Sequence, residues 1–351
     1  MMVMKQFLPC SVRFLRAIVA FVVLLFSPWV NLGLSTTTVV AAGAPTNVVF
    51  LPVLVKGLLP VLNPVVLVVS LPFSAPANNP QQHTELLIRL LEEASRYHGY
   101  KDPDARPYFR FHIFGGAVVQ PATPPPLLGN GTYDFEWIYA QYNICALAQT
   151  GQIDEVWLWD AGQGGFPEWT VRGPEWNATN GVYNPPNCGV QLVTMVFNYD
   201  REIDVALHSF NHRIEGMASR YFRCDLFTET WPWLNNWSGC NGLASDRYGF
   251  VARPSAANGF VGACGDVHHP PNITDAHDYD YYSMVSSQTI CEDWSQDGSA
   301  AIQTVTCERW GCTHAGFQIW WLQNMPGYNS TNRNRNGQPM PNWLAYLFGS
   351  P

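Results

Sequence analysis

The sequence predicts an α/β fold in which helices flank a mostly parallel sheet, followed by an irregular region rich in disulfides and aromatic residues. Between residues 65 and 223, short apolar runs rich in β-branched residues alternate with segments of helical periodicity. Such alternation is typical of parallel strands joined by crossover helices. From residue 224 onward the periodicity weakens, and six of the nine cysteines lie there. We therefore expect an α/β layer over residues 65–223, with a cysteine- and tryptophan-rich region, residues 224–351, packed on it.

The individual elements follow from the spacing of apolar residues. Short apolar runs predict strands, whereas apolar residues three and four apart predict helices. In chain order we expect a strand at 65–70, a helix at 81–97, a strand at 108–114, a helix at 133–149, a strand at 155–159, a strand at 192–197 and a long helix at 201–223. Of the later aromatic residues, Trp320 and Trp321 are expected to fill the core of the second region.

The first 44 residues predict a secretory signal peptide. Lys5, Arg13 and Arg16 precede the apolar run 17–26, and small residues follow before position 45. A basic start, a short apolar segment and a small-residue cleavage site are typical of such signals. The run is too short to cross a bilayer securely, so no stable membrane span is expected after cleavage. Residues 45–64, interrupted by prolines, form a lead-in to the first strand.

Cysteine usage and charge agree with export. Eight of the nine cysteines lie beyond the signal and allow up to four disulfides. Cys307 and Cys312 are close enough to close a local turn, and Cys224 and Cys240 can close a longer loop. Acidic residues outnumber basic ones, 27 to 19, and no basic stripe is present, so nucleic acid is not an expected partner.

The long helix predicted at 201–223 carries two patterns. Apolar residues recur at spacings of four and three and form one seam. His208, His212 and Glu215 recur at the same spacings on the opposite side. An imidazole pair at i, i+4 with a carboxylate on the next turn can share one metal ion or one proton network. The pair resembles the helix of zinc metalloproteases, but Ser209 stands where that motif has its glutamate. The alternative is a solvated polar face.

A second group of metal-ligating side chains follows Cys264. It comprises His268, His269, His277 and Asp278, in a stretch whose prolines favour an extended loop. Histidine together with carboxylate oxygen suits a divalent metal ion, and we expect zinc. The alternative is a tight polar loop whose acids accept hydrogen bonds from backbone amides.

Acidic residues also gather where the predicted strands end. Asp160 closes the strand at 155–159, and Glu168 follows a glycine-rich stretch. Ligands bind beyond the carboxyl ends of parallel strands, so the two acids predict a pair for glycoside cleavage. Each alone is also compatible with a helix cap or a surface role. Because His208 lies about two turns into its helix, roughly 10 Å by helix rise, Glu168 is expected in another pocket unless its loop folds back.

Together these patterns favour an exported metal-dependent hydrolase acting on an extracellular peptide or glycan. Glu215 and Glu168 are the expected catalytic residues. The expected metal ligands are His208, His212, His268, His269, His277 and Asp278. Two alternatives stay open: a secreted protein that binds glycans or cell walls through exposed tryptophans such as Trp231 and Trp233, and a glycosidase that uses Asp160 and Glu168.

Overall fold

The computed structural model divides the chain into two units, Met1–Pro60 and Val61–Pro351. The described residues all lie in the second unit, and their ranges are 61–71, 78–129, 132–160, 167–175, 177–181, 185–226, 249–251, 261–273, 279–327 and 330–348. The predicted signal peptide and most of the predicted lead-in fall outside these ranges. Among the helices that the structure describes, none combines the length and apolar character that a membrane crossing needs.

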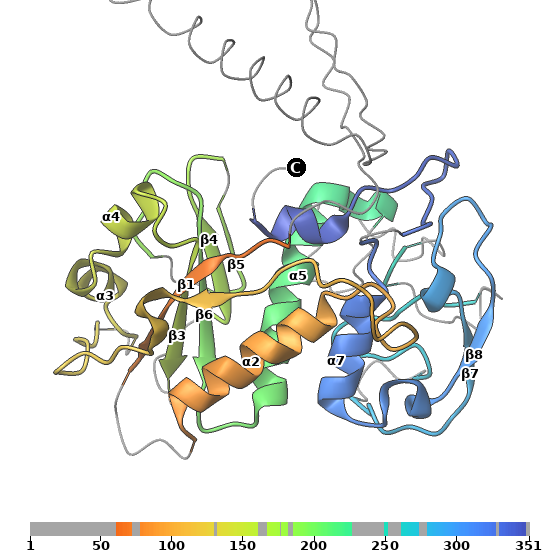
Figure 1. Ribbon diagram of the computed structural model, residues 1–351, viewed down its shortest axis with the longest axis horizontal. Helices are drawn as coiled ribbons and strands as arrows, with labels where there is room; N and C mark the ends of the chain where they lie inside the picture. The colour runs from red at the N-terminus through yellow and green to blue at the C-terminus, as the bar shows by residue number, and fades with distance from the viewer. Residues whose placement is uncertain are drawn as a thin grey trace, which may run out of the picture. The chain divides into compact units, whose positions relative to one another are not determined.

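The second unit contains a six-stranded mixed sheet (Figure 1). Its strand order is β2-β1-β3-β6-β4-β5. The first four strands of this order are parallel, whereas β4 and β5 are antiparallel to their neighbours. In chain order the strands span Val65–Ser70 (β1), His112–Ile113 (β2), Glu155–Asp160 (β3), Trp169–Arg172 (β4), Ala178–Thr179 (β5) and Leu192–Asn198 (β6). The predicted sheet with mostly parallel strands is thus present.

Helices cover both faces of this sheet, which explains why its central strands are apolar on both sides. Successive residues of β1 divide between the faces because side chains alternate along a strand. Val66 and Val68 join the core completed by α2, α5 and α7, whereas Leu67 and Val69 join the core beneath α3 and α4. The helices span Pro80–Ala94 (α2), Phe135–Gln141 (α3), Ile144–Gln149 (α4), Ile203–Leu226 (α5) and His314–Gln323 (α7).

Three elements differ from the sequence prediction. The helix expected at 133–149 is two short helices, because Asn143 adopts a left-handed conformation (φ 51°) between them, which asparagine tolerates better than most residues. The strand expected at 108–114 is reduced to β2, and Phe109 pairs with Leu62 only through an isolated bridge. Strands β4 and β5 had no predicted counterpart, since runs of four and two residues are too short to show a periodicity.

Apart from α7, the described part of the region that follows α5 contains only short regular elements. Strands β7 and β8 form a two-stranded antiparallel sheet. The short elements are Ser287–Thr289 (β7), Gln303–Val305 (β8), and the 3₁₀ helices Cys291–Asp293 (η2), Cys307–Trp310 (η3) and Trp343–Phe348 (η4), while Phe114–Gly116 (η1) belongs to the α/β layer. Irregular structure in this region agrees with the loss of periodicity in its sequence.

Disulfides and buried aromatic rings hold this second region together. Its described disulfides are Cys264–Cys291 and Cys307–Cys312, and the second of these was predicted. A third disulfide, Cys145–Cys188, lies in the α/β layer. The predicted pair Cys224–Cys240 lies outside the residues whose side chains are described. The expected burial of Trp320 and Trp321 is confirmed. Among the described residues of this region, five tryptophans are at most 5 % exposed: Trp294, Trp310, Trp320, Trp321 and Trp343.

Candidate metal centre

Helix α5 carries its apolar seam and its histidine pair on different sides, as its sequence predicted. Leu207, Phe210 and Ile214 are buried in the core between the helix and the sheet. His208 and His212 lie on another side of the helix, one turn apart, and their ring centroids are 4.6 Å apart. The helix backbone alone brings these two imidazoles together, because residues i and i+4 share a face.

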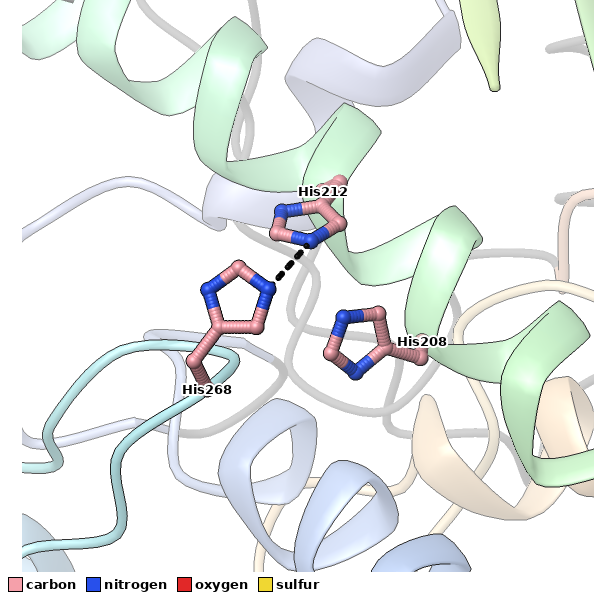
Figure 2. A group of neighbouring side chains, drawn as sticks. All are labelled: His208, His212 and His268. Carbon is pink, nitrogen blue, oxygen red and sulfur yellow. Dashed lines mark hydrogen bonds between the residues drawn. The ribbon is translucent and has the colours of Figure 1, made fainter. Parts of the chain in front are cut away.

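The loop at 264–273 covers the polar side of α5. Its conformation is fixed by Asp266, whose Oδ1 accepts hydrogen bonds from the backbone N–H groups of His268 and His269, each at 2.9 Å. Gly265 is required at the turn, since its φ is +74° and a Cβ there would collide with the carbonyl oxygen of His269. In this conformation the imidazole of His268 faces the helix (Figure 2).

His208, His212 and His268 form a triad of imidazoles (Figure 2). One ring nitrogen of each lies within 4.8 Å of the other two, and Nε2 of His212 is 3.0 Å from Nε2 of His268. Two nitrogens bound to one tetrahedral zinc ion at about 2.0–2.1 Å are about 3.4 Å apart. Small side-chain rotations therefore convert the triad into a three-histidine site. All three residues are half-buried, so an ion can reach them from solvent.

Glu215 fixes the orientation of His212. Nδ1 of His212 is 3.0 Å from Oε2 of Glu215, and Oε1 accepts the backbone N–H of Val267 at 2.8 Å. Burial raises the pKa of Glu215. Burial also disfavours the charged form of His212, but the hydrogen bond and the negative charge of Glu215 outweigh it and raise the pKa of His212. The carboxylate thus accepts Nδ1–H and directs Nε2 toward the triad.

A fourth histidine, His314, joins the cluster as the first residue of α7. Its Nε2 is 2.9 Å from Nδ1 of His208, and its Nδ1 is 3.0 Å from Oδ2 of Asp204 in the first turn of α5. The sequence did not single out His314, because the nearby Cys307 and Cys312 are expected to pair with each other and no other histidine lies near it in the sequence. The contact between α5 and α7 brings it here. Its only local signal was the N-cap residue Thr313, which marks the start of a helix.

Most imidazoles of the cluster are held in the neutral form that binds metal ions. Burial, together with the charges of neighbouring histidines, lowers the pKa of His208 and lowers that of His268 to about 3. Burial lowers the pKa of His314 in spite of the nearby carboxylate. His212, whose pKa is raised, is the imidazole of the triad that keeps its proton to the highest pH, and its Nε2 lies 3.0 Å from Nε2 of His268. A divalent cation at this centre replaces that proton, as metal binding to histidines generally does.

A second group of ligand-type atoms, from Asp266, His268 and His269, also lies within 4.8 Å. Oδ1 of Asp266 already accepts three hydrogen bonds, two from backbone N–H groups and one from Nδ1 of His269 at 2.8 Å. His269 is fully buried. These contacts shape the loop, and they leave His269 outside the triad. The predicted ligands His277 and Asp278 lie outside the described residues.

Glu168 reaches the same side of α5 from the sheet. Because β4 runs antiparallel to β6, Glu168 enters the sheet beside Val196. Its Oε1 accepts a hydrogen bond from Oγ of Ser209 at 2.9 Å, and its Oε2 accepts one from Nδ2 of Asn180 at 2.7 Å. Ser209 directly follows the first histidine of the helix pair. The chain thus folds back and brings this carboxylate to α5, which is the case in which a separate pocket was not expected.

Comparison with protein-family models, with curated proteins and with solved structures found no match to this chain. A function therefore has to be inferred from the chemistry of the site itself. The basis for that inference is the imidazole triad, the carboxylate behind His212, and Glu168 beside the helix.

Proposed function

We propose that the protein is a metal-dependent hydrolase whose zinc ion is bound by His208, His212 and His268. The observation that carries this proposal is the convergence of three imidazole nitrogens within 4.8 Å from a helix and a loop far apart in the sequence. Imidazole suits zinc and related transition metals. Three protein ligands with a fourth position left for water are typical of catalytic zinc, whereas structural zinc sites use four.

The two predicted catalytic carboxylates are assigned different roles. Zinc held by three histidines lowers the pKa of its bound water to about 7. Both oxygens of Glu215 are engaged, one by His212 and one by the backbone of Val267, so we assign Glu215 the orientation of a ligand. Glu168 is half-buried, and its partners are the hydroxyl of Ser209 and a side-chain amide. Water or substrate can displace these partners, and we assign Glu168 the general base that accepts the proton of the attacking water.

The proposed substrate is a peptide or glycan outside the cell. Three disulfides among the described residues fit an extracellular protein, because such cross-links persist in oxidising compartments. The predicted signal peptide supports the same location. Both amide and glycosidic bonds are cleaved by water, so a metal-activated water serves either substrate class.

Metal content is the most direct test. The purified protein is expected to hold one zinc ion per chain and to lose it to a chelator, with a fall in melting temperature because binding to the folded state alone stabilises it. The His212→Ala variant is expected to retain less than a tenth of the bound zinc under the same conditions. His112→Ala is the matched control, since His112 is an exposed histidine of β2 that contacts Asn63.

Activity is tested on panels of peptides and glycans with the zinc-loaded protein. Glu168→Gln is expected to lower the rate about 100-fold or more, as loss of a general base does, while zinc content stays unchanged. The proposal is wrong if the protein binds no zinc, nickel, cobalt or iron at stoichiometric level and if chelators leave its melting temperature unchanged.

The alternatives gain no specific support from the described residues. Asp160, the proposed partner of Glu168 in a glycosidase, is only 2 % exposed at the end of β3. A glycan-binding surface needs exposed tryptophans, and among the tryptophans that the structure describes all are buried except Trp137, which is half-buried. Trp231 and Trp233 lie outside the described ranges.

A further inference from the structure

The two ring nitrogens of His208 face different partners. Nδ1 is 2.9 Å from Nε2 of His314. The other ring nitrogen is directed at the imidazoles of His212 and His268, as Figure 2 shows. Only one nitrogen of a neutral imidazole carries a hydrogen, and a metal ligand needs its lone pair on the nitrogen that faces the ion. Whether His208 binds a metal therefore depends on what holds the hydrogen on its Nδ1.

A carboxylate at the far end of this chain of contacts determines where the hydrogens lie. Nδ1 of His314 is 3.0 Å from Oδ2 of Asp204, and an ionised carboxylate only accepts hydrogen bonds. Nδ1 of His314 is therefore the donor, and a neutral His314 has its lone pair on Nε2. That lone pair accepts Nδ1–H of His208, which leaves the lone pair of His208 on Nε2, facing the triad.

A neighbouring amide does not reverse this assignment. Nε2 of Gln318 is 3.4 Å from Nδ1 of His208, but it donates to the carbonyl oxygen of Val267 at the shorter distance of 2.8 Å. The Oε1 of Gln318 accepts a hydrogen bond from Nδ2 of Asn211 at 2.8 Å. The second hydrogen of this amide nitrogen faces Nδ1 only at 3.4 Å, whereas Nε2 of His314 lies at 2.9 Å and is the closest polar contact of Nδ1.

The ring of His314 is held in place from two directions. Its position at the start of α7 is fixed by the Thr313 N-cap, whose Oγ1 accepts the backbone N–H of Gly316 at 3.0 Å. The aromatic ring of Tyr281 stacks on it, with centroids 4.3 Å apart and planes at 18°. The hydroxyl of Tyr281 donates to the carbonyl oxygen of Val267 in the loop that carries His268. The ring therefore has little freedom to turn away from His208.

We propose that Asp204 and His314 are positioning residues of the metal centre. Asp204 fixes the tautomer of His314, and His314 fixes the tautomer and orientation of His208, so that Nε2 of His208 is ready to bind a divalent cation. Asp204 acts on His208 as Glu215 acts on His212. The difference is that the imidazole of His314 lies between Asp204 and the metal ligand. The inference rests on the proposed metal site, and its test separates the two.

The first measurement is zinc affinity by competition with a chelator. His314→Leu and Asp204→Ala are each expected to weaken zinc binding about 10–100-fold, the usual effect of removing a carboxylate or donor behind a metal ligand. His314→Gln keeps a side chain that can accept from His208 and donate to Asp204, and it is expected to recover most of the affinity. Because both residues act along one chain of contacts, Asp204→Ala is expected to add little in the His314→Leu background.

Two controls separate positioning from folding. Glu202→Ala removes an exposed carboxylate beside the start of α5 without touching His314, and it is expected to leave zinc affinity unchanged. Melting curves of the metal-free variants show which of them are folded. If folded His314→Leu and Asp204→Ala proteins bind zinc as tightly as the original protein does, the positioning role is wrong.

The second measurement needs no metal. Long-range ¹H–¹⁵N correlation spectra of the metal-free protein report which nitrogen of each imidazole carries hydrogen. His208 is expected as the Nδ1–H tautomer in the original protein and as a mixture of tautomers in His314→Leu. An Nε2–H tautomer in the original protein contradicts the inference even if zinc binds. If His208 shows the Nδ1–H tautomer but the protein binds no divalent cation, the contacts from Asp204 through His314 to His208 stand as described. In that case only the proposed function is overturned.

Discussion

The α/β layer and the cysteine-rich region that follows it keep their structure in different ways, yet each supplies half of the histidine cluster. In the layer, helices cover both faces of a sheet whose central strands are parallel. His208 and His212 lie on one side of α5 because they are four residues apart in the helix. In the second region the strands have three residues each, and disulfides and tryptophans hold the backbone that carries His268 and His314. The first pair of imidazoles depends on local helix geometry, whereas the second pair depends on cross-links and long-range packing.

The largest effect is expected from a substitution inside the layer. Arg213 on α5 is fully buried and forms a bidentate ion pair with Glu155 on β3, at 2.7 and 2.8 Å, and it also donates to the backbone oxygen of Leu347. Arg213→Ala leaves a buried carboxylate without its counter-charge, which is expected to reduce the free energy of unfolding by about 3–5 kcal/mol. Urea denaturation measures this loss.

The matched control for this ion pair is Arg110→Ala. Arg110 forms a similar bidentate pair with Glu92, but at the surface, where such pairs contribute less than about 1 kcal/mol. Comparable losses for Arg110→Ala and Arg213→Ala would mean that burial of the α5–β3 contact is not what stabilises the layer.

Disulfide removal tests the contrast between the two regions directly. Replacing Cys264 and Cys291 by serine is expected to reduce the free energy of unfolding by about 2–4 kcal/mol and to weaken zinc binding, because Cys264 begins the loop that carries His268. Replacing Cys145 and Cys188 removes a cross-link on the face of the sheet opposite to α5 and is expected to destabilise the protein by a similar amount with zinc affinity unchanged. Equal loss of zinc affinity in both variants would refute the division of roles.

The same contrast explains how much of the site the sequence could predict. The pairing of His208 and His212 was predictable because a helix sets neighbours four residues apart, whatever surrounds it. The approach of His268 was expected only as a hypothesis. His314 was not expected at all, since no pattern in the sequence indicates that α7 packs against α5. Glu168 reaches α5 through β4, a strand too short to be recognised from its sequence.

Backbone strain in the loop gives a smaller effect. Gly265 has φ +74°, and a Cβ at this position would collide with the carbonyl oxygen of His269. Gly265→Ala is expected to reduce the free energy of unfolding by about 2–3 kcal/mol through strain and overpacking and to weaken zinc binding by displacing His268. Gly298 has a similar φ of +83° with open space around it, so Gly298→Ala reports the strain alone, about 1–2 kcal/mol. If the two alanine variants behave alike, the loop tolerates displacement and does not position His268.

The smallest effect is expected from acid in the metal-free protein. Burial lowers the pKa of His268 from 6.5 to about 3 and also lowers the pKa values of His208 and His314. A group with a lowered folded-state pKa binds fewer protons in the folded than in the unfolded protein, so its contribution to stability is complete above pH 6.5 and is lost as the pH falls from 6.5 toward the folded-state value. The raised pKa of His212 changes stability with pH in the opposite direction. The three histidines with lowered pKa values are expected to outweigh this single group.

Urea denaturation between about pH 7.5 and pH 5 measures this dependence, since ordinary carboxyl groups titrate mostly below that window. Stability is expected to fall with the pH, and His268→Asn is expected to show a shallower fall. His112→Leu, which removes an exposed histidine of the layer, is expected to keep the original slope. A shallower slope for His112→Leu, or an unchanged slope for His268→Asn, would place the acid sensitivity outside the histidine cluster that joins the two regions.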